Sequence, residues 1–323
     1  MKTILVLALE GVMDSSLAIT LDTIRAGQAF LSGARKPGRV QLLVAGHKKS
    51  IRTGGGLRLN ADLTFAEVPG LTRWPDWIVI PGLGLVSDKA IGSRLQKKDA
   101  MAAMALLRMA PRSVRVGASC SSVFLLADTG LLSGRNVTMT WWLAHLFRAR
   151  HPDVRLDETK MLVRDGPILT AGSAYAQLDL MLAIVTDCMG TSIAHLCSRY
   201  LIIDQRPSQA RYMIHAHAQH VDPTVVAAER WIDAHLAGPI SIADLAAELA
   251  VSPKTLARRI EAATGLSPVK FLQRRRLLHA SHLIETTSMS IEAVAARVGY
   301  QDGTALRKLV RREFGTTPGA LRS

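Results

Sequence analysis

The sequence predicts an α/β domain followed by a smaller all-α domain. Two observations support this prediction. Up to residue 188, short apolar runs alternate with segments of helical periodicity, and between residues 241 and 318 one helical pattern occurs twice. The chain has 323 residues, which is enough for two domains of ordinary size.

The α/β part begins with a continuous apolar run at residues 3–9, as expected of a strand buried in a parallel sheet. Further strands are expected at residues 40–45, 77–80, 114–118, 137–139, 161–164 and 168–171, with a hairpin-like stretch through Leu59. Helices are expected at residues 14–31, 95–109, 123–128, 142–150 and 175–188. This alternation predicts an open, mostly parallel, flavodoxin-like sheet with helices on both faces, whose ligands bind beyond the carboxyl ends of the strands.

The all-α part contains a duplicated pattern. The first copy spans residues 242–268 and the second spans residues 291–318, with one extra residue in the turn of the second copy. In each copy, apolar residues at helical spacing are followed by a tight turn and a second short helix. Ser252 and Pro253 match an N-cap followed by a first-turn proline, and a Leu- and Arg-rich helix at residues 268–285 joins the copies.

Two such helix pairs suit the binding of double-stranded DNA. A short helix with Lys and Arg on its outer face fits the major groove, where these side chains reach guanine edges and phosphates. The alternative is a helical packing module with a solvated charged face. Two copies with matched spacing, each closed by Gly-x-Ser/Thr-Pro, favour DNA as the partner.

The formal net charge of +14 also favours a polyanionic partner. Residues 222–323, however, contain 14 basic and 10 acidic side chains, which leaves a charge of +10 on the rest of the chain. The excess positive charge is therefore not concentrated in the all-α part. It belongs either to a solvated surface or to a face that lies near the duplex.

Three cysteines, Cys120, Cys188 and Cys197, show neither disulfide nor metal-ligand spacing, so we expect a reducing cytoplasm, no metal and no cofactor. No apolar run is long enough to span a bilayer. The apolar N-terminus is interrupted by Glu10 and Asp14, which favours a first strand over a signal peptide.

Residues 241–322 resemble the DNA-binding domain of the AraC family of transcription regulators. The matching marks are Leu-Ala-x-x-Leu-x-Val-Ser-Pro-x-x-Leu-x-Arg in the first copy, Val-Gly-Tyr-x-Asp in the second, and the closing Gly-x-Thr-Pro. The resemblance implies two helix-turn-helix units that place their recognition helices in successive major grooves. It assigns to the two recognition helices the residues Lys254, Thr255, Arg258 and Arg259, and Gly303, Thr304, Arg307, Lys308 and Arg311. Because Gly303 has no side chain and Lys308 lacks the guanidinium fork of Arg258, we expect the first unit to supply most of the base recognition.

Cys120 lies in Val-Gly-Ala-Ser-Cys-Ser-Ser, which predicts a strand, a sharp turn and the start of a helix. Free amides and the helix dipole at such a turn are expected to lower the pKa of the thiol. Amides of the loop at residues 82–84 are expected to form an anion-binding concavity beside it.

Residues 2–191 resemble the PfpI subgroup of the class I glutamine amidotransferase-like superfamily. The match rests on Asp-x-Ile-Val-Ile-Pro-Gly at residues 76–82, on the cysteine turn, on residues 124–135, and on Leu-Thr-Ala-Gly before the final helix. Enzyme-like relatives carry a histidine where this chain has Thr140, which cannot accept a proton at neutral pH. Their acidic residue in the first helix has a shorter counterpart, Asp22. We therefore expect no enzyme; the alternative is a thiol-dependent hydrolase or amidotransferase that uses Cys120.

The combined resemblance implies a cytoplasmic transcription regulator. We expect an effector-sensing and dimerisation domain at residues 1–202, a linker at 203–221 and a DNA-binding domain at 222–323. The linker contains three histidines whose His-x-His spacing is compatible with a metal site, but no carboxylate or cysteine pattern supports one, so a polar connector is favoured. The expected partners are promoter DNA, a second copy of the chain, RNA polymerase and a small nitrogenous effector. The residues expected to bind the effector are Asp22, Gly82, Cys120, Ser121 and Trp141.

Overall fold

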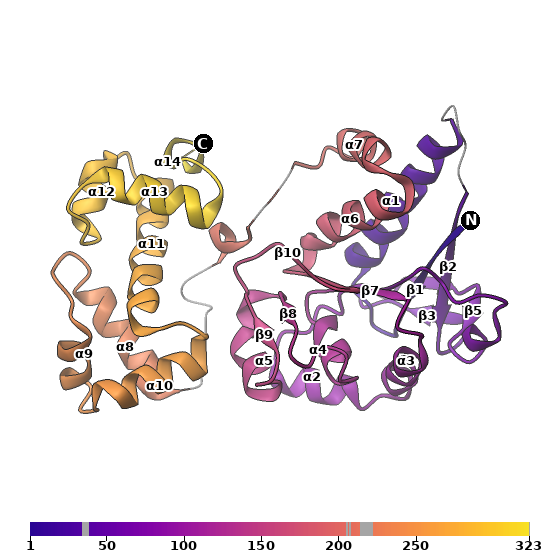
Figure 1. Ribbon diagram of the computed structural model, residues 1–323, viewed down its shortest axis with the longest axis horizontal. Helices are drawn as coiled ribbons and strands as arrows, with labels where there is room; N and C mark the ends of the chain where they lie inside the picture. Colours follow the sequence, from indigo (N-terminus) through magenta and orange to yellow (C-terminus); the bar gives the residue numbers. More distant parts are fainter. Residues whose placement is uncertain (34–38, 205, 207, 214–221, 323) are drawn as a thin grey trace. The chain divides into compact units, whose positions relative to one another are not determined.

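The structure, a computed structural model, describes residues 1–33, 39–204, 206, 208–213 and 222–322. The chain divides into two compact units (Figure 1). The N-terminal unit consists of Met1–Leu143 and His151–Arg206, and the C-terminal unit consists of Ala144–Arg150 and Pro207–Ser323. The three histidines of the predicted linker, at positions 215, 217 and 220, lie outside the described residues. Within the described part of the chain, no helix is both long and apolar enough to cross a membrane.

A sheet of seven strands forms the centre of the N-terminal unit, in the order β10-β11-β7-β6-β1-β2-β5. Neighbouring strands pair in parallel, except that β10 and β11 are antiparallel. The strands are β1 Lys2–Leu7, β2 Val40–Gly46, β5 Leu63–Thr64, β6 Trp77–Ile80, β7 Arg115–Ser119, β10 Leu162–Asp165 and β11 Ile168–Ala171. Strand β6 is fully buried along its length, as is the second half of β1, which explains why both are written as unbroken apolar runs.

Helices cover both faces of this sheet (Figure 1). On one face lie α1 Asp14–Ser32, α6 Gln177–Met189 and α7 Thr191–Tyr200, and on the other lie α2 Asp88–Leu95, α3 Lys98–Met109 and α4 Ser122–Ala127. Ile24 of α1 and Leu180 of α6 are completely buried in one core with Ile4 of β1. The predicted open α/β sheet with helices on both faces is confirmed.

Smaller elements connect the main ones. The predicted hairpin is formed by β3 Ser50–Arg52 and β4 Arg58–Asn60, and β8 Asn136–Val137 pairs in parallel with β9 Arg155–Leu156. Short 3-10 turns occur at Val68–Gly70, Trp141–Leu143, Ala174–Ala176 and Ala210–Tyr212, and α5 is Ala144–Arg150.

Some elements of the N-terminal unit were not predicted from the sequence, namely α2, α7, β5 and β9. The predicted helix at residues 95–109 corresponds to α3, which begins at Lys98. Helix α2 ends at Leu95 and is a separate helix with its own N-cap, Ser87, whose hydroxyl accepts from the amide of Ala90. Helix α7 is separated from α6 only by Gly190, whose φ of +95° reverses the chain. Helices α2 and α7 have only 8 and 10 residues, so few turns carry their apolar pattern.

The C-terminal unit is helical and contains two cores that share one long helix. Its helices, besides α5, are α8 Pro223–Ala234, α9 Ile242–Glu248, α10 Pro253–Thr264, α11 Pro268–Thr286, α12 Ile291–Arg297, α13 Gly303–Phe314 and α14 Pro318–Leu321. Phe271 at the start of α11 packs with α8, α9 and α10, whereas Leu277 and Ile284 further along α11 pack with α12, α13 and α14. Helix α11 is the predicted joining helix, and α8 was not predicted.

The two helix-turn-helix units differ in their turns. The residue with positive φ is Ala250 (+53°) in the first and Gly299 (+78°) in the second. The extra residue of the second copy follows Gly299, before the N-cap Asp302. Both recognition helices are capped, because the Ser252 hydroxyl accepts from Thr255 N at 3.1 Å and the Asp302 carboxylate accepts from Thr304 N at 2.7 Å.

Candidate functional site

Helix α10 carries two exposed basic side chains, Lys254 and Arg258. Leu256 and Ile260 are completely buried on its inner side, which leaves Lys254 and Arg258 exposed on the outer side. Within the described residues, neither cation forms a hydrogen bond or an ion pair with another side chain. Thr255 is half-buried and shares a hydrogen bond of 2.9 Å with the N-cap hydroxyl. The arrangement leaves the long side chains of Lys254 and Arg258 available to a ligand.

Arg259 is placed differently from Arg258. Its guanidinium hydrogen-bonds the Thr224 hydroxyl and lies 3.6 Å from a carboxylate oxygen of Asp222, both at the start of α8. The side chain therefore joins α10 to α8, in addition to any contact with DNA. Sequence analysis missed the contact between Arg259 and α8, because Asp222 is far from Arg259 along the chain.

Helix α13 carries fewer unengaged groups near its start. Gly303 is buried, and a Cβ atom there would lie 2.9 Å from Glu292 Oε1 of α12. The same carboxylate oxygen forms an ion pair of 2.6 Å with Arg307. Thr304, Lys308 and Arg311 are exposed. The second recognition helix is thus positioned by an intramolecular ion pair that uses one of its predicted DNA contacts.

Two arginines of α11 hold the C-terminal unit together. Arg275 is buried and ion-paired with Glu229 and Asp233 of α8. Arg276 donates to the carbonyl oxygens of Gly299 at 3.1 Å and of Gly238 at 2.7 Å. Helix α11 is therefore fixed both to α8 and to the turn of the second unit, which sets the spacing between the recognition helices. Sequence analysis missed both roles, and the run of arginines at residues 274–276 was the only signal.

In the N-terminal unit, Cys120 occupies the sharp turn that the sequence predicts between β7 and α4. Its φ is +54°, which is costly for a residue with a Cβ atom, and its side chain is buried. The conformation is held by the Cys120 amide, which donates to the carbonyl oxygens of Ala171 at 3.2 Å and Gly172 at 2.8 Å.

The prediction of a lowered thiol pKa is wrong. Burial raises the pKa of Cys120. Hydrogen bonds from Ser121, Thr140 and the amide of Gly84 oppose this rise but do not outweigh it. A thiolate at this position would lose its hydration completely, and the few donors around it do not replace that hydration.

Thr140 lies beside the thiol, at the position where the family resemblance places a histidine. It is fully buried, within hydrogen-bonding reach of Cys120 and 3.4 Å from the Ser173 hydroxyl. The groups that hydrogen-bond the thiol are hydroxyls and amides, and none of them takes up a proton at neutral pH. The arrangement does not supply the base that a thiol nucleophile needs.

Gly82 brings its loop against the cysteine turn. A Cβ atom at Gly82 would lie 3.2 Å from Cys120 Cβ and 3.3 Å from Ser16 Oγ, so a larger residue would force the loop away. The Gly82 amide donates to Ser16 Oγ at 2.7 Å, and the Leu85 amide donates to Ser121 Oγ at 3.1 Å. In the predicted anion-binding loop at residues 82–84, the Gly82 amide is therefore already engaged, and the Gly84 amide hydrogen-bonds the Cys120 thiol.

Asp22 does not lie with the cysteine turn, which corrects the prediction. Its carboxylate is 66% exposed and lies 3.8 Å from Arg25. The buried side of α1 instead carries Ser16 and Thr20, and Ser16 makes the contact with the Gly82 loop. The two positions differ by six residues along a helix of 3.6 residues per turn, so they face different directions.

A buried set of hydrogen-bonded polar residues extends from Ser16 through Thr20 to Gln177. Gln177 Nε2 donates to the Thr20 hydroxyl at 2.7 Å, and that hydroxyl donates to the carbonyl oxygen of Ser16 at 2.7 Å. The oxygen Oε1 of Gln177 and the hydroxyl of Ser119 are buried and have no hydrogen-bond partner among the described residues. Sequence analysis missed this group, because short polar residues on a helix carry no motif.

Trp141 is 7% exposed and packs edge to face against Trp142, with ring centroids 5.3 Å apart. The Trp142 indole nitrogen is buried without an acceptor in the described part of the chain. Trp141 is therefore a largely enclosed side chain next in sequence to Thr140.

Two family models match the chain. The model of the DJ-1/PfpI family matches residues 2–187, more than half of the chain, and a model described as a helix-turn-helix domain matches residues 245–323.

Curated relatives match the chain over different lengths. The chain is 28% identical over 225 residues to the HTH-type transcriptional regulator GlxA of Rhizobium meliloti (strain 1021), an alignment that covers 67% of this chain and 68% of the relative. It is 36% identical over 92 residues to the HTH-type transcriptional activator RhaS of Klebsiella pneumoniae (strain 342), which covers 28% of this chain and 33% of the relative.

A solved structure shows the same fold in the N-terminal unit. DJ-1beta of Drosophila melanogaster superposes with a TM-score of 0.50 at 18% identity, over 63% of this chain and 99% of that one. The relatives that match about two thirds of this chain are HTH-type transcriptional regulators. The chain therefore belongs to the DJ-1/PfpI family and is an AraC-family helix-turn-helix transcriptional regulator with an N-terminal DJ-1/PfpI domain.

Proposed function

We propose that the first helix-turn-helix unit supplies most of the base recognition and that the second mainly contacts phosphates. The observation that supports this division is the contrast between Arg258, which is exposed and unpaired within the described residues, and Arg307, which is paired with Glu292 at 2.6 Å. An unengaged guanidinium can grip a guanine edge through two hydrogen bonds, whereas a paired one must first give up its partner.

A gel-shift assay with DNA from upstream of the regulator's own operon tests this proposal. Binding that prefers this DNA over random sequence, and that weakens steeply with salt, is expected. Loss of the preference in Arg258→Ala but not in the pair Arg307→Ala and Lys308→Ala supports the division. The reverse ranking contradicts it.

We further propose that the N-terminal unit binds a small nitrogenous effector in the cytoplasm, near Gly82, Cys120, Ser121 and Trp141. The support is the buried polar group beside this turn, in which the Ser119 hydroxyl lacks a hydrogen-bond partner in the described part of the chain. Burying such atoms without partners costs free energy, and a polar ligand would offset that cost. Ammonium or amide groups of an amino acid or a quaternary amine would suit the hydroxyls and the indole faces.

The same proposal assigns dimerisation to the N-terminal unit and includes RNA polymerase as a partner at the promoter. A thermal-shift screen of the full chain against amino acids and quaternary amines is the direct test, because a ligand that binds only the folded state raises its stability. The test has two informative outcomes: a stabilising compound whose effect depends on Trp141 supports the site, and a stabilising compound that is indifferent to Trp141→Leu places the effector elsewhere.

A further inference from the structure

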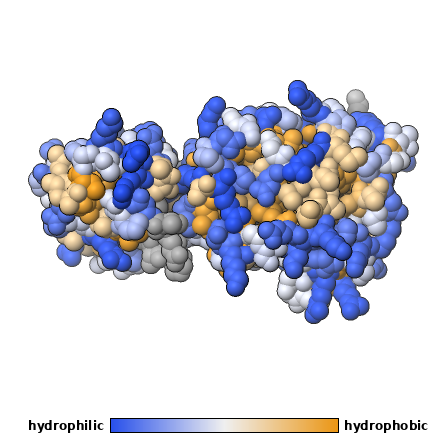
Figure 2. Space-filling model, turned by 90° about the horizontal axis from the view of Figure 1, so that it is seen from below, coloured by the Kyte–Doolittle hydropathy of each residue, from blue (hydrophilic) through white to orange (hydrophobic). Residues whose placement is uncertain are grey.

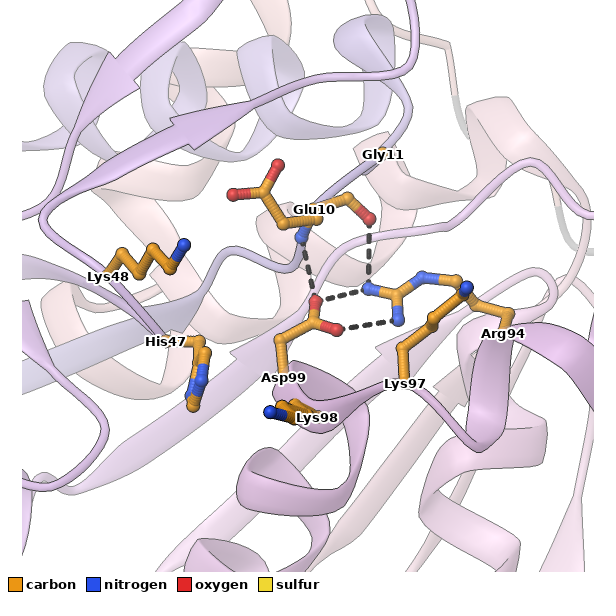
Figure 3. Close-up of a pocket in the computed structure, with 8 residues that line it drawn as sticks. All are labelled: Glu10, Gly11, His47, Lys48, Arg94, Lys97, Lys98 and Asp99. Carbon is orange, nitrogen blue, oxygen red and sulfur yellow. Dashed lines mark hydrogen bonds and ion pairs between the residues drawn. The ribbon is translucent and has the colours of Figure 1, made fainter.

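A hollow lies on the N-terminal unit, and the cysteine turn does not line it. Its volume is about 510 Å³, which is in the range of sites for small metabolites. It is lined by residues that follow β1 and β2 at their carboxyl ends and by the junction between α2 and α3 (Figure 3). None of the residues that line it belongs to the group around Cys120.

Its lining is cationic. Lys48, Lys97 and Lys98 are exposed at the hollow, and Arg94 lines it as well, against the carboxylates of Glu10 and Asp99. Four permanent cations and two carboxylates leave a charge of +2 on the lining. The net charge of the lining is therefore part of the formal charge of +10 that lies outside residues 222–323.

The two carboxylates are already engaged. Asp99 is buried and held by both terminal nitrogens of Arg94, and it also accepts from the Glu10 amide at 2.9 Å. The Arg94 guanidinium beside Asp99 helps to hold the pKa of that carboxyl below its ordinary value, although burial opposes this. The Glu10 carboxylate accepts from the amide of Arg52 at 3.1 Å, and Figure 3 shows it turned away from Lys97 and Lys98.

The lysines, by contrast, have no such partners. Within the described residues, Lys48, Lys97 and Lys98 form no hydrogen bond or ion pair with another side chain. Three ammonium groups around one hollow repel each other, and a multivalent anion relieves that repulsion.

The donor type indicates the kind of anion. The guanidinium fork that would best recognise a planar carboxylate is occupied by Asp99. The remaining donors are ammonium groups, which act as point charges and suit the several oxygens of a phosphate. We propose that this hollow binds a small phosphorylated molecule, at a site separate from the one proposed for the nitrogenous effector.

Thermal-shift measurements on the full chain test this inference, with inorganic phosphate, glucose 6-phosphate and citrate as probes and sodium chloride of equal ionic strength as the reference. We expect both phosphate compounds to raise the melting temperature more than citrate does, and chloride to have no comparable effect. Replacing Lys97 and Lys98 together by Gln should weaken the response about tenfold or more in apparent Kd, as expected for lost charge-assisted contacts.

Two controls separate this site from other basic surfaces. Lys89→Gln, at an exposed lysine of α2 outside the lining, should leave the response unchanged, and Arg258→Gln should do so as well, since it alters only α10. DNA binding by the Lys97→Gln and Lys98→Gln double variant, measured without phosphate, should remain intact. A missing phosphate response can therefore be distinguished from a failure of the DNA-binding proposal. A phosphate response that survives in the double variant, or is lost in Arg258→Gln, would overturn the inference, as would stabilisation by citrate alone.

Discussion

Arg276 of the joining helix donates to the carbonyl oxygen of Gly299, the turn residue of the second helix-turn-helix unit, over 3.1 Å. Its other terminal nitrogen donates to Gly238, in the connection between α8 and α9. One guanidinium therefore links the turn of the second helix-turn-helix unit to the connection between α8 and α9, and we expect the spacing of α10 and α13 to depend on it. An AraC-type domain that contacts successive grooves requires such a fixed spacing.

Arg276→Met should lower the free energy of unfolding of the C-terminal unit by about 2 kcal/mol or more, because two backbone carbonyls lose a charged donor. It should also weaken binding to the full operator more than binding to a half-site. Urea denaturation and titration of the two duplexes measure these effects. Arg297→Met, at an exposed arginine of α12, is the matched control and should change little. Equal loss on both duplexes would show that Arg276 does not set the spacing.

The two turns predict opposite responses to exchange of Ala and Gly. Ala250 has a φ of +53°, so Ala250→Gly should relieve strain and raise stability by about 0.5–1 kcal/mol after the entropy cost of glycine. In Gly299→Ala the new Cβ would lie 2.3 Å from the Leu236 carbonyl oxygen, so a loss of about 2 kcal/mol or more is expected. Thermal or chemical unfolding of both variants provides the comparison. A destabilised Ala250→Gly would mean that the strain at Ala250 is small.

Arg258→Ala should cost about 1–3 kcal/mol of binding to the specific duplex, the value of one bidentate contact with a base. Random DNA should lose much less. Lys308→Ala should weaken both duplexes by similar factors and reduce the dependence of binding on salt. If Arg258→Ala lost the same binding free energy on specific and random DNA, Arg258 would contact only phosphate and would not recognise a base.

Cys120 should react slowly with iodoacetamide at neutral pH. The thiolate is the reactive form, and because burial raises the pKa of this thiol, the thiolate accumulates only as the pH rises above the ordinary range for cysteine. The rate should therefore increase continuously with pH and show no plateau near pH 7. Cys120→Ser should keep specific DNA binding. A fast reaction at neutral pH would revive the thiol-enzyme alternative.

The fold was predictable where the pattern is strong. The buried strand at Trp77–Ile80, the cap at Ser252 and the joining helix from Pro268 are visible in the sequence because burial and capping restrict residue type locally. Helix α2 was missed because it is short and contains Gly92.

The site was less predictable, because its properties depend on neighbours distant in sequence. The pKa of Cys120 follows from burial, which the cysteine turn alone does not reveal. Asp22 was assigned by the family resemblance, as the counterpart of an acidic residue in the first helix, but the direction it faces depends on which side of α1 packs on the sheet. The partners of Arg259 and Arg307 became known only from the packing of α8 and α12.

Exposed apolar side chains on the N-terminal unit mark surfaces that these predictions leave unassigned. They include Val86, Met101 and Met109, each more than half exposed. Figure 2 shows apolar residues of this unit at the surface, between strongly hydrophilic ones. The variants proposed above lie outside these three positions, so changes in solubility and changes in DNA binding can be separated.

Base recognition by Arg258 is tested most directly by fluorescence anisotropy of the full chain with labelled DNA from upstream of its own operon, compared with a scrambled duplex over a range of salt concentrations. We expect preferential binding to the upstream DNA, a steep loss of affinity with salt, and loss of the preference in Arg258→Ala. Equal affinity for both duplexes at every salt concentration, unchanged by Arg258→Ala, would contradict this expectation.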